Sequence, residues 1–153
     1  MEESSRDVLL VRAGARVCAL PIADVAETMR PLRTAPLSGT PAFVAGAAIA
    51  RGVASPVVNL DALLGGSGGP GGADARYVRL RCGGRSALLA VDAVLGVSRL
   101  AIREGDAPPL LAGAAGGVVE SLGALDGALL LVLRASRLVP EEAFRAAAAE
   151  EPA

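Results

Sequence analysis

Residues 43–61 read FVAGAAIARGVASPVVNLD, and this stretch decides the fold that the sequence predicts. It contains two apolar runs of small and branched side chains, joined by Arg51-Gly52. Because glycine favours the backbone of a tight turn, the stretch predicts two antiparallel strands with a turn at that pair. Arg51 is then either a solvated turn residue or a fixed cation that the hairpin presents to a partner.

A hairpin pattern occurs twice in the chain. Residues 8–11 and 17–22 are rich in strand-forming residues and flank Gly14, and residues 77–81 and 85–91 flank Gly83-Gly84 in the same way. One constant offset (83 − 14 = 69) relates the two copies. It aligns these pairs: Arg12 with Arg81, Arg16 with Arg85, Ile22 with Val91, and Val25 with Val94.

A second similarity links residues 56–64 with residues 131–139, at an offset of 132 − 57 = 75. Each of these segments follows a glycine turn, Arg51-Gly52 in the first copy and Asp126-Gly127 in the second. Together the two similarities predict two alike β units. Residues 65–72, GGSGGPGG, predict a flexible loop, because ordering so many glycines costs too much conformational entropy.

Strands are predicted to dominate over helices. Apolar runs are short and separated by Gly and Pro, which favours barrels or sandwiches over a sheet of alternating strands and helices. Residues 22–29 could form one or two helical turns after Pro21. Pro140 and the acidic pair Glu141-Glu142 predict the start of a C-terminal helix that continues to Ala149.

The composition excludes several classes of function. The chain has 153 residues, enough for one domain or two small subdomains, and is 52% hydrophobic but only 2% aromatic. With 15 basic and 16 acidic residues its formal charge is −1, which gives no attraction to phosphate backbones. Nucleic acid is therefore not an expected ligand, and the scarcity of aromatic rings removes a platform for stacking bases.

Catalytic chemistry has few candidate groups. Every basic residue is Arg, and the chain contains no Lys and no His, so Schiff-base lysines and Ser-His-Asp relays are absent. The carboxylates Asp24, Glu27, Asp61 and Asp92 show no pairing that predicts acid–base work. We therefore expect neither an enzyme nor a cofactor.

The two cysteines predict no metal site. Cys18 and Cys82 lie far apart, without a second ligand beside either, and both fall on apolar strands where core packing is expected. The N-terminus is acidic and polar, and no apolar run approaches the length of about 20 residues that a membrane span needs. These features predict a cytoplasmic protein with reduced thiols.

The residues described so far, in their order along the chain, resemble the CheW-like family of chemotaxis adaptors. The resemblance covers about residues 8–139. Its motifs in this sequence are PIADVAE at 21–27, APLSGTP at 35–41, FVAG at 43–46, Arg51-Gly52, PVVNL at 56–60, VDAVLGV at 91–97 and LDG at 125–127. The sequence departs from the family pattern at Ile49, Asn59 and Thr28, which puts the binding surfaces in question more than the fold.

The resemblance implies an all-β fold of two small five-stranded SH3-like barrels packed together, with a short C-terminal helix. We expect a first barrel at roughly residues 20–75, a second at roughly 76–139 with terminal segments crossing over, and a helix and tail at 140–153. It further implies a non-catalytic adaptor that links a chemoreceptor tip to a CheA-type histidine kinase. The alternative is a divergent scaffold or inhibitory module that has lost one of these interfaces.

By resemblance, two groups of residues would contact partners. Those expected on the side that faces the kinase regulatory domain are Glu27, Thr28 and Met29. Those expected to border a groove for the receptor's helical hairpin tip are Gly46, Arg51, Gly52, Val91 and Asp92. For Arg51 the alternative is an intramolecular ion pair that fixes the turn, and Gly46 is expected to serve backbone geometry more than contact chemistry.

Overall fold

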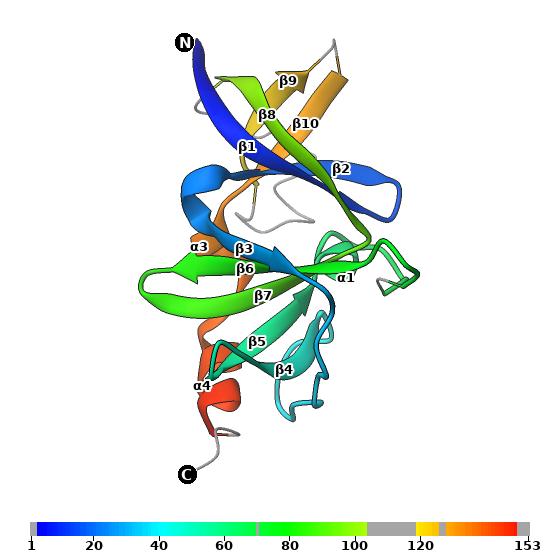
Figure 1. Cartoon of the computed structure of the whole chain (residues 1–153), viewed down its shortest axis with the longest axis vertical. Coiled ribbons are helices and arrows are strands. Elements are labelled where there is room, and N and C mark those ends of the chain that lie inside the picture. The colour runs from blue at the N-terminus through cyan, green and yellow to red at the C-terminus, as the bar shows by residue number, and fades with distance from the viewer. Residues whose placement is uncertain (1–2, 70, 104–118, 126–127, 150–153) are drawn as a thin grey trace.

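The computed structural model describes residues 3–69, 71–103, 119–125 and 128–149, and strands dominate these ranges (Figure 1). The strands are β1 (Glu3–Ala13), β2 (Arg16–Pro21), β3 (Val25–Met29), β4 (Val44–Ala50), β5 (Val53–Asn59), β6 (Arg76–Cys82), β7 (Arg85–Val91), β8 (Ala93–Arg103), β9 (Val119–Leu125) and β10 (Ala128–Leu133). The helices are η1 (Ile22–Asp24), α1 (Leu60–Leu63), α3 (Ala135–Leu138) and α4 (Glu141–Ala149).

The strands form two five-stranded units, which confirms the predicted fold class. One unit is a closed barrel in the order β1-β2-β10-β9-β8, and the other is a sheet in the order β3-β6-β7-β5-β4. We call them unit A and unit B; they occupy the upper and lower halves of Figure 1. In unit B the chain after β3 returns to the far edge, where Ala35 forms an isolated bridge with Ala47 of β4.

The boundary expected between residues 75 and 76 differs from the observed strand pairing. Strands β6 and β7 pair with β3 and β5 in unit B, whereas β1 and β2 pair with β8 and β10 in unit A. Each copy of the repeat therefore contributes its hairpin to the unit built by the other copy's remaining strands. The sequence repeat revealed two alike units, but it carries no information about which copy's hairpin completes which sheet.

The internal duplication is confirmed at the level of strand register. Val11 pairs with Val94 between β1 and β8, and its counterpart Leu80 pairs with Val25 between β6 and β3. The parallel pair between Val132 and Ala19 likewise corresponds to the pair between Val57 and Leu88. Register shifts also recur at matching places, so the two copies share their irregularities as well as their strands.

Among the described residues, three hydrophobic clusters hold the molecule together. A small cluster fills unit A around Val8 and Leu100, and another fills unit B around Val57 and Leu88. The largest cluster lies where the two hairpins pack on each other, and we call it the seam. It contains both members of five equivalent pairs: Leu9 and Val78, Val11 and Leu80, Ala13 and Cys82, Cys18 and Ala87, Leu20 and Leu89.

The expectation of helical turns at residues 22–29 is only partly correct. Residues 22–24 form the short helix η1, but residues 25–29 form β3, whose Val25 pairs with Leu80 of β6. Strand pairing with a distant segment outweighs the weak local preference for a helix there. The expected turn at Asp126-Gly127 lies outside the described residues.

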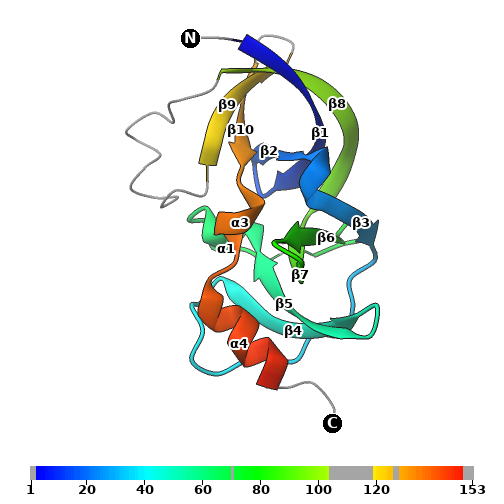
Figure 2. The ribbon, with the colours of Figure 1, turned by 90° about the vertical axis from the view of Figure 1, so that its left-hand side faces the viewer.

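The C-terminal helix α4 begins and ends where the sequence predicts, and it packs against β4 and β5 of unit B (Figure 2). Ala143 and Ala147 are fully buried on its inner face. Arg85, at the start of β7, donates to both carboxylate oxygens of Glu141 at 3.0 and 2.8 Å and lies 3.9 Å from the centre of the Phe144 ring. The helix therefore contacts the β6–β7 hairpin as well as β4 and β5. No helix in the described ranges has the length and apolar character needed to cross a bilayer.

The seam generates a prediction with a matched pair of variants. Leu20 and Leu89 are equivalent in the two copies, and both are fully buried. We expect Leu20→Ala and Leu89→Ala each to lower the free energy of unfolding by about 2–5 kcal/mol, because each leaves a cavity in the shared core. Chemical denaturation followed by circular dichroism should show a single transition in both variants.

The control is Val53→Ala, at a side chain that is 44% exposed, which should cost less than about 1 kcal/mol. Two separate unfolding transitions, one moved by each leucine variant, would show that the units fold independently and that the seam is not shared.

Candidate partner-binding surface

The β4–β5 hairpin turns at Arg51 and Gly52, as the sequence predicts. Ala50 pairs with Val53, so the loop has two residues, and both take positive φ, 53° for Arg51 and 79° for Gly52. Arg51 is the only described residue other than glycine with positive φ. That backbone costs a side-chain-bearing residue about 1–2 kcal/mol. The turn therefore holds an arginine in a conformation for which glycine or asparagine is the ordinary choice.

The carboxylate of Glu27 in β3 accepts hydrogen bonds from the side chains of two arginines. Arg51 donates from Nε and Nη2 to the two carboxylate oxygens at 2.9 and 2.6 Å, and Arg79 of β6 donates from Nε at 2.8 Å. We call these three side chains the Glu27 clasp. A register shift between Val25 and Glu27 places Glu27 opposite Arg79. The clasp connects β3, β6 and the β4–β5 turn.

The clasp changes the acid–base properties of Glu27. Hydrogen bonds from Arg51, followed by those from Arg79, lower the pKa of the Glu27 carboxyl to about 2. The same bond to Glu27 raises the pKa of the Arg51 guanidinium. The Arg51 side chain is nevertheless 71% exposed, against 21% for Glu27. The intramolecular pair expected as the alternative for Arg51 is thus present, and the cation still faces solvent.

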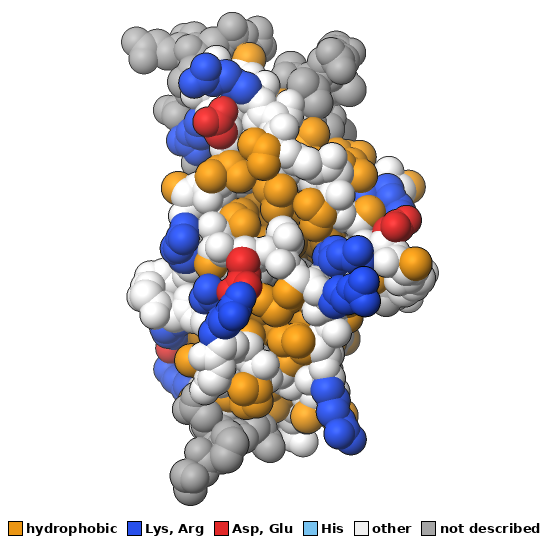
Figure 3. Space-filling view, viewed as in Figure 1, with side chains coloured by type: hydrophobic (Ala, Val, Ile, Leu, Met, Phe, Trp, Pro, Cys, Tyr) orange, Lys and Arg blue, Asp and Glu red, His pale blue; other side chains and the backbone are white. Residues whose placement is uncertain are grey.

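A shallow hollow of about 240 Å³ lies beside the clasp. Its lining combines the charged pair with apolar side chains: Glu27, Met29, Leu32, Ile49, Ala50 and Arg51. Met29 and Leu32 also pack against the interior of unit B. On the face seen in Figure 3, hydrophobic side chains gather over the middle, with basic and acidic groups around them. An apolar floor with a charged rim is the usual composition of a protein–protein contact.

The other predicted residues near the clasp have different settings. Thr28 follows Glu27 on β3 and is exposed. Gly46 has φ of 151°, and a Cβ there would collide with the carbonyl oxygen of Ala35. The close approach of Ala35 to β4 therefore requires glycine, which agrees with the backbone role expected for Gly46.

Val91 and Asp92 lie apart from the clasp, at the junction of β7 and β8. Val91 is 1% exposed and belongs to the seam, so its side chain cannot form a rim, and any effect on a partner passes through packing. Asp92 is half-buried; its Oδ2 accepts a hydrogen bond from the N–H of Gly14 at 2.6 Å, and its own N–H donates to the carbonyl of Arg12 at 2.8 Å. These bonds fix the β1–β2 turn against the junction.

Three positions singled out in the sequence have structural roles. Asn59 accepts a hydrogen bond from the N–H of Ala62 and so caps α1. Cys18 and Cys82 are buried and unpaired, and burial raises the pKa of each thiol to about 11, which leaves them protonated and unreactive at neutral pH. Within the described ranges no cluster of ligating side chains could hold a metal ion.

Sequence reasoning missed Arg79 and Leu32, and it noted Ile49 only as a departure from the family pattern. Alternation along residues 77–81 places Arg79 on the outward face, but its pairing with Glu27 depends on the register shift in β3. Leu32 and Ile49 join the hollow because the chain after β3 folds back toward β4. No local pattern signals either contact.

Comparison with known proteins identifies a family and finds solved structures of similar fold. The model of the CheW-like domain matches residues 7–143. The crystal structure of the scaffolding protein TtCheW from Thermoanaerobacter tengcongensis is similar with a TM-score of 0.75. That likeness covers 86% of this chain and 90% of TtCheW at 23% identity, so it is a likeness of fold. No curated protein sequence matches the chain.

The clasp predicts a measurable pH dependence. Glu27 should titrate near pH 2 by NMR, and Arg51→Asn or Arg79→Gln should each raise its pKa toward the ordinary value of 4.5. Asparagine is chosen at position 51 because it tolerates positive φ. Since the folded-state pKa is lowered, the stabilisation is present above about pH 4.5 and is lost as the pH falls toward 2. Arg85→Gln, at the α4 contact, should leave the Glu27 pKa unchanged; a wild-type value near 4.5 would contradict the clasp.

Gly46 generates a second prediction. Gly46→Ala should destabilise the fold by more than about 2 kcal/mol, because the new Cβ meets the Ala35 backbone in addition to the strain of positive φ. The matched control is Gly39→Ala, since Gly39 has φ of 75° but open space around its Cβ position, and should cost only about 1–2 kcal/mol. Equal losses in thermal denaturation would show that the contact with Ala35 is unimportant.

Proposed function

Because the chain belongs to the CheW-like domain family, a family of scaffold and coupling proteins, we propose that it is a non-catalytic cytoplasmic adaptor. Its partners in this proposal are the regulatory domain of a CheA-type histidine kinase and the cytoplasmic tip of a chemoreceptor. It needs no cofactor. The observation that supports it most directly is an exposed charged rim, the Glu27 clasp, held on a rigid two-unit body.

Rigidity is what an adaptor of this kind requires. Two weak interfaces on one body hold their ligands near each other at high effective concentration, provided that their relative position does not change. The seam is continuous with both units and contains fully buried leucines from each hairpin. Individual interfaces of modest area, with affinities near 1 µM or about −8 kcal/mol, would then suffice for assembly and exchange.

The proposed kinase contact lies along β3. Glu27, Thr28 and Met29 are consecutive there, and they combine a clasped carboxylate, an exposed hydroxyl and a half-buried thioether. Thr28 is the position best suited to a test, since its exposed side chain makes no hydrogen bond with another described residue.

The proposed receptor contact uses the β4–β5 turn and the β7–β8 junction. Arg51 and Gly52 would form its rim, Asp92 would border it at the junction, and Gly46 and Val91 would support it through the backbone and the seam. A guanidinium at the rim suits a carboxylate or the carbonyls at a helix end. Because Arg51 bonds to Glu27, the kinase and receptor contacts would meet at one ion pair.

The alternative is a divergent scaffold or inhibitory module that retains the fold but binds only one of these partners. The departures at Thr28 and Ile49, both exposed and beside the clasp, are the observations that favour it. A wild-type protein that binds one partner and not the other would establish this alternative.

Two surface variants test the proposal by isothermal titration calorimetry against a purified kinase regulatory domain and a purified receptor tip. Thr28→Arg should weaken kinase binding at least tenfold, because it places a bulky charge in the contact, and should change receptor binding little. Arg51→Asn keeps the turn but removes the guanidinium, so it should weaken receptor binding more than kinase binding.

Arg99→Glu on β8 is the control, since Arg99 is 74% exposed and belongs to neither proposed contact. It should bind both partners as the wild type does. Absence of binding to both proteins by the wild type would refute the adaptor function.

A further inference from the structure

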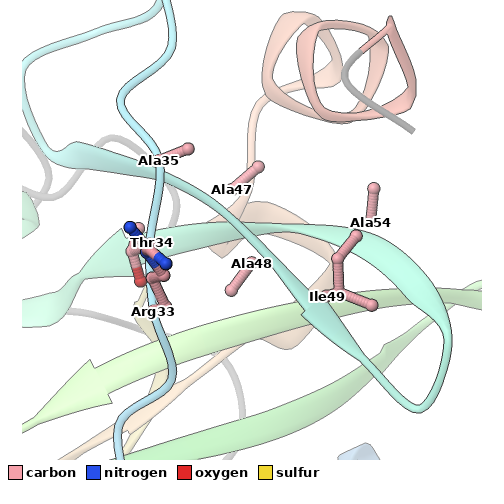
Figure 4. A pocket seen from close by; sticks show the side chains of 7 residues that line it. All are labelled: Arg33, Thr34, Ala35, Ala47, Ala48, Ile49 and Ala54. Carbon is pink, nitrogen blue, oxygen red and sulfur yellow. The ribbon is translucent and has the colours of Figure 1, made fainter. Parts of the chain in front are cut away.

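A second hollow opens on the other side of Ile49, between residues 33–35 and β4 (Figure 4). Its volume is about 220 Å³. Small side chains form most of its wall, and the lining residues are Arg33, Thr34, Ala35, Ala47, Ala48, Ile49 and Ala54. The hollow is large enough for one branched or aromatic side chain.

The hollow exists because β4 is an edge strand that is only partly covered. Ala35 and Ala47 exchange two backbone hydrogen bonds of 2.8 Å, and no further bridge to β4 follows among the described residues. Backbone groups alternate in direction along an antiparallel strand, so the N–H and C=O of Ile49 point to the same edge as those of Ala47. The edge therefore offers the N–H of Ile49 as a hydrogen-bond donor and its C=O as an acceptor, and no described residue bonds to either group.

The polar groups around the hollow make its rim positively charged. The Thr34 hydroxyl is already shared with the Tyr77 hydroxyl at 2.7 Å and the Leu32 carbonyl at 3.0 Å. Arg33 is exposed, and it makes no ion pair or hydrogen bond with another described residue. No residue that lines the hollow is acidic. A partner with negative charge is complementary to this surface.

We propose that this edge of β4 binds a short, extended, acidic segment of a partner protein. An apolar side chain of the segment fills the alanine-lined hollow, its backbone pairs with Ile49, and a carboxylate beside that side chain bonds to Arg33. Adding a strand to a free sheet edge, with a pocket for an alternate side chain, is a common way to bind an extended peptide. The surface uses none of the residues assigned to the kinase and receptor contacts, and it adjoins the hollow beside the clasp at Ile49, which lines both.

The probe is a synthetic peptide with capped ends, Asp-Glu-Val-Glu-Leu-Glu-Asp, titrated into ¹⁵N-labelled protein and followed by NMR. We expect a dissociation constant between about 1 µM and 1 mM, with shift changes centred on residues 33–35, 47–49 and 54, which line the hollow. Two peptides serve as comparisons: one in which Val and Leu are Ser, and one in which every acid is Lys. Both should bind at least tenfold more weakly.

Protein variants separate the components of the contact. Arg33→Glu should weaken the acidic peptide at least tenfold, whereas Arg99→Glu in unit A should not. Ile49→Pro and Ile49→Ala both remove the isoleucine side chain, but only proline removes the N–H, and proline is tolerated on an edge strand. Weaker binding by the proline variant than by the alanine variant would therefore report the backbone bond.

Three outcomes would overturn the proposal. They are equal binding of the acidic and Lys-containing peptides, shift changes located away from β4, and an Arg33→Glu variant that binds as the wild type does. Calorimetry of Arg33→Glu with the kinase domain and the receptor tip should be unchanged, so failure here is distinguishable from failure of the adaptor function.

Discussion

The packing of one hairpin against its counterpart is the interaction on which the rest of the structure depends. Each hairpin pairs on both sides with strands of the other copy, and its outer face forms half of the seam. Neither unit therefore has a complete set of strands from one contiguous half of the chain. The same side chains that join the units also cover the sheets, so the fold and the relative position of the units are fixed together.

The packing of the two hairpins explains how the surface can contain a residue with a strained backbone and a cluster of charged side chains. An arginine with positive φ costs local stability. A glutamate shared by two guanidinium groups contributes little stability when the pair is exposed. The buried seam, built from leucine, valine, alanine and cysteine, carries the stability and leaves the β4–β5 turn free for recognition. Features that break a local rule on an otherwise consistent fold are where function is usually found.

Much of the fold could be predicted from the sequence because its signals are local and repeated. The hairpins were predicted from glycine turns, alternating strands and the constant offset between the copies. The start of α4 was predicted from a proline followed by two acidic residues. The place of the β6–β7 hairpin in unit B and the strand at residues 25–29 could not be predicted, since both depend on pairing between distant segments. At the surface, Arg51 and Glu27 were found separately, but their ion pair and Arg79 emerge only when register brings three strands together.

The exchange of hairpins determines what would happen if the glycine-rich connection between the copies were cut. Residues 65–69 and 71–74 are exposed and link β5 with β6, that is, the end of one copy with the start of the next. A protease that cut there would produce two fragments that are interwoven through both sheets. Such a nicked molecule should stay assembled, and the two pieces, produced separately, should behave as complementary halves of a split reporter.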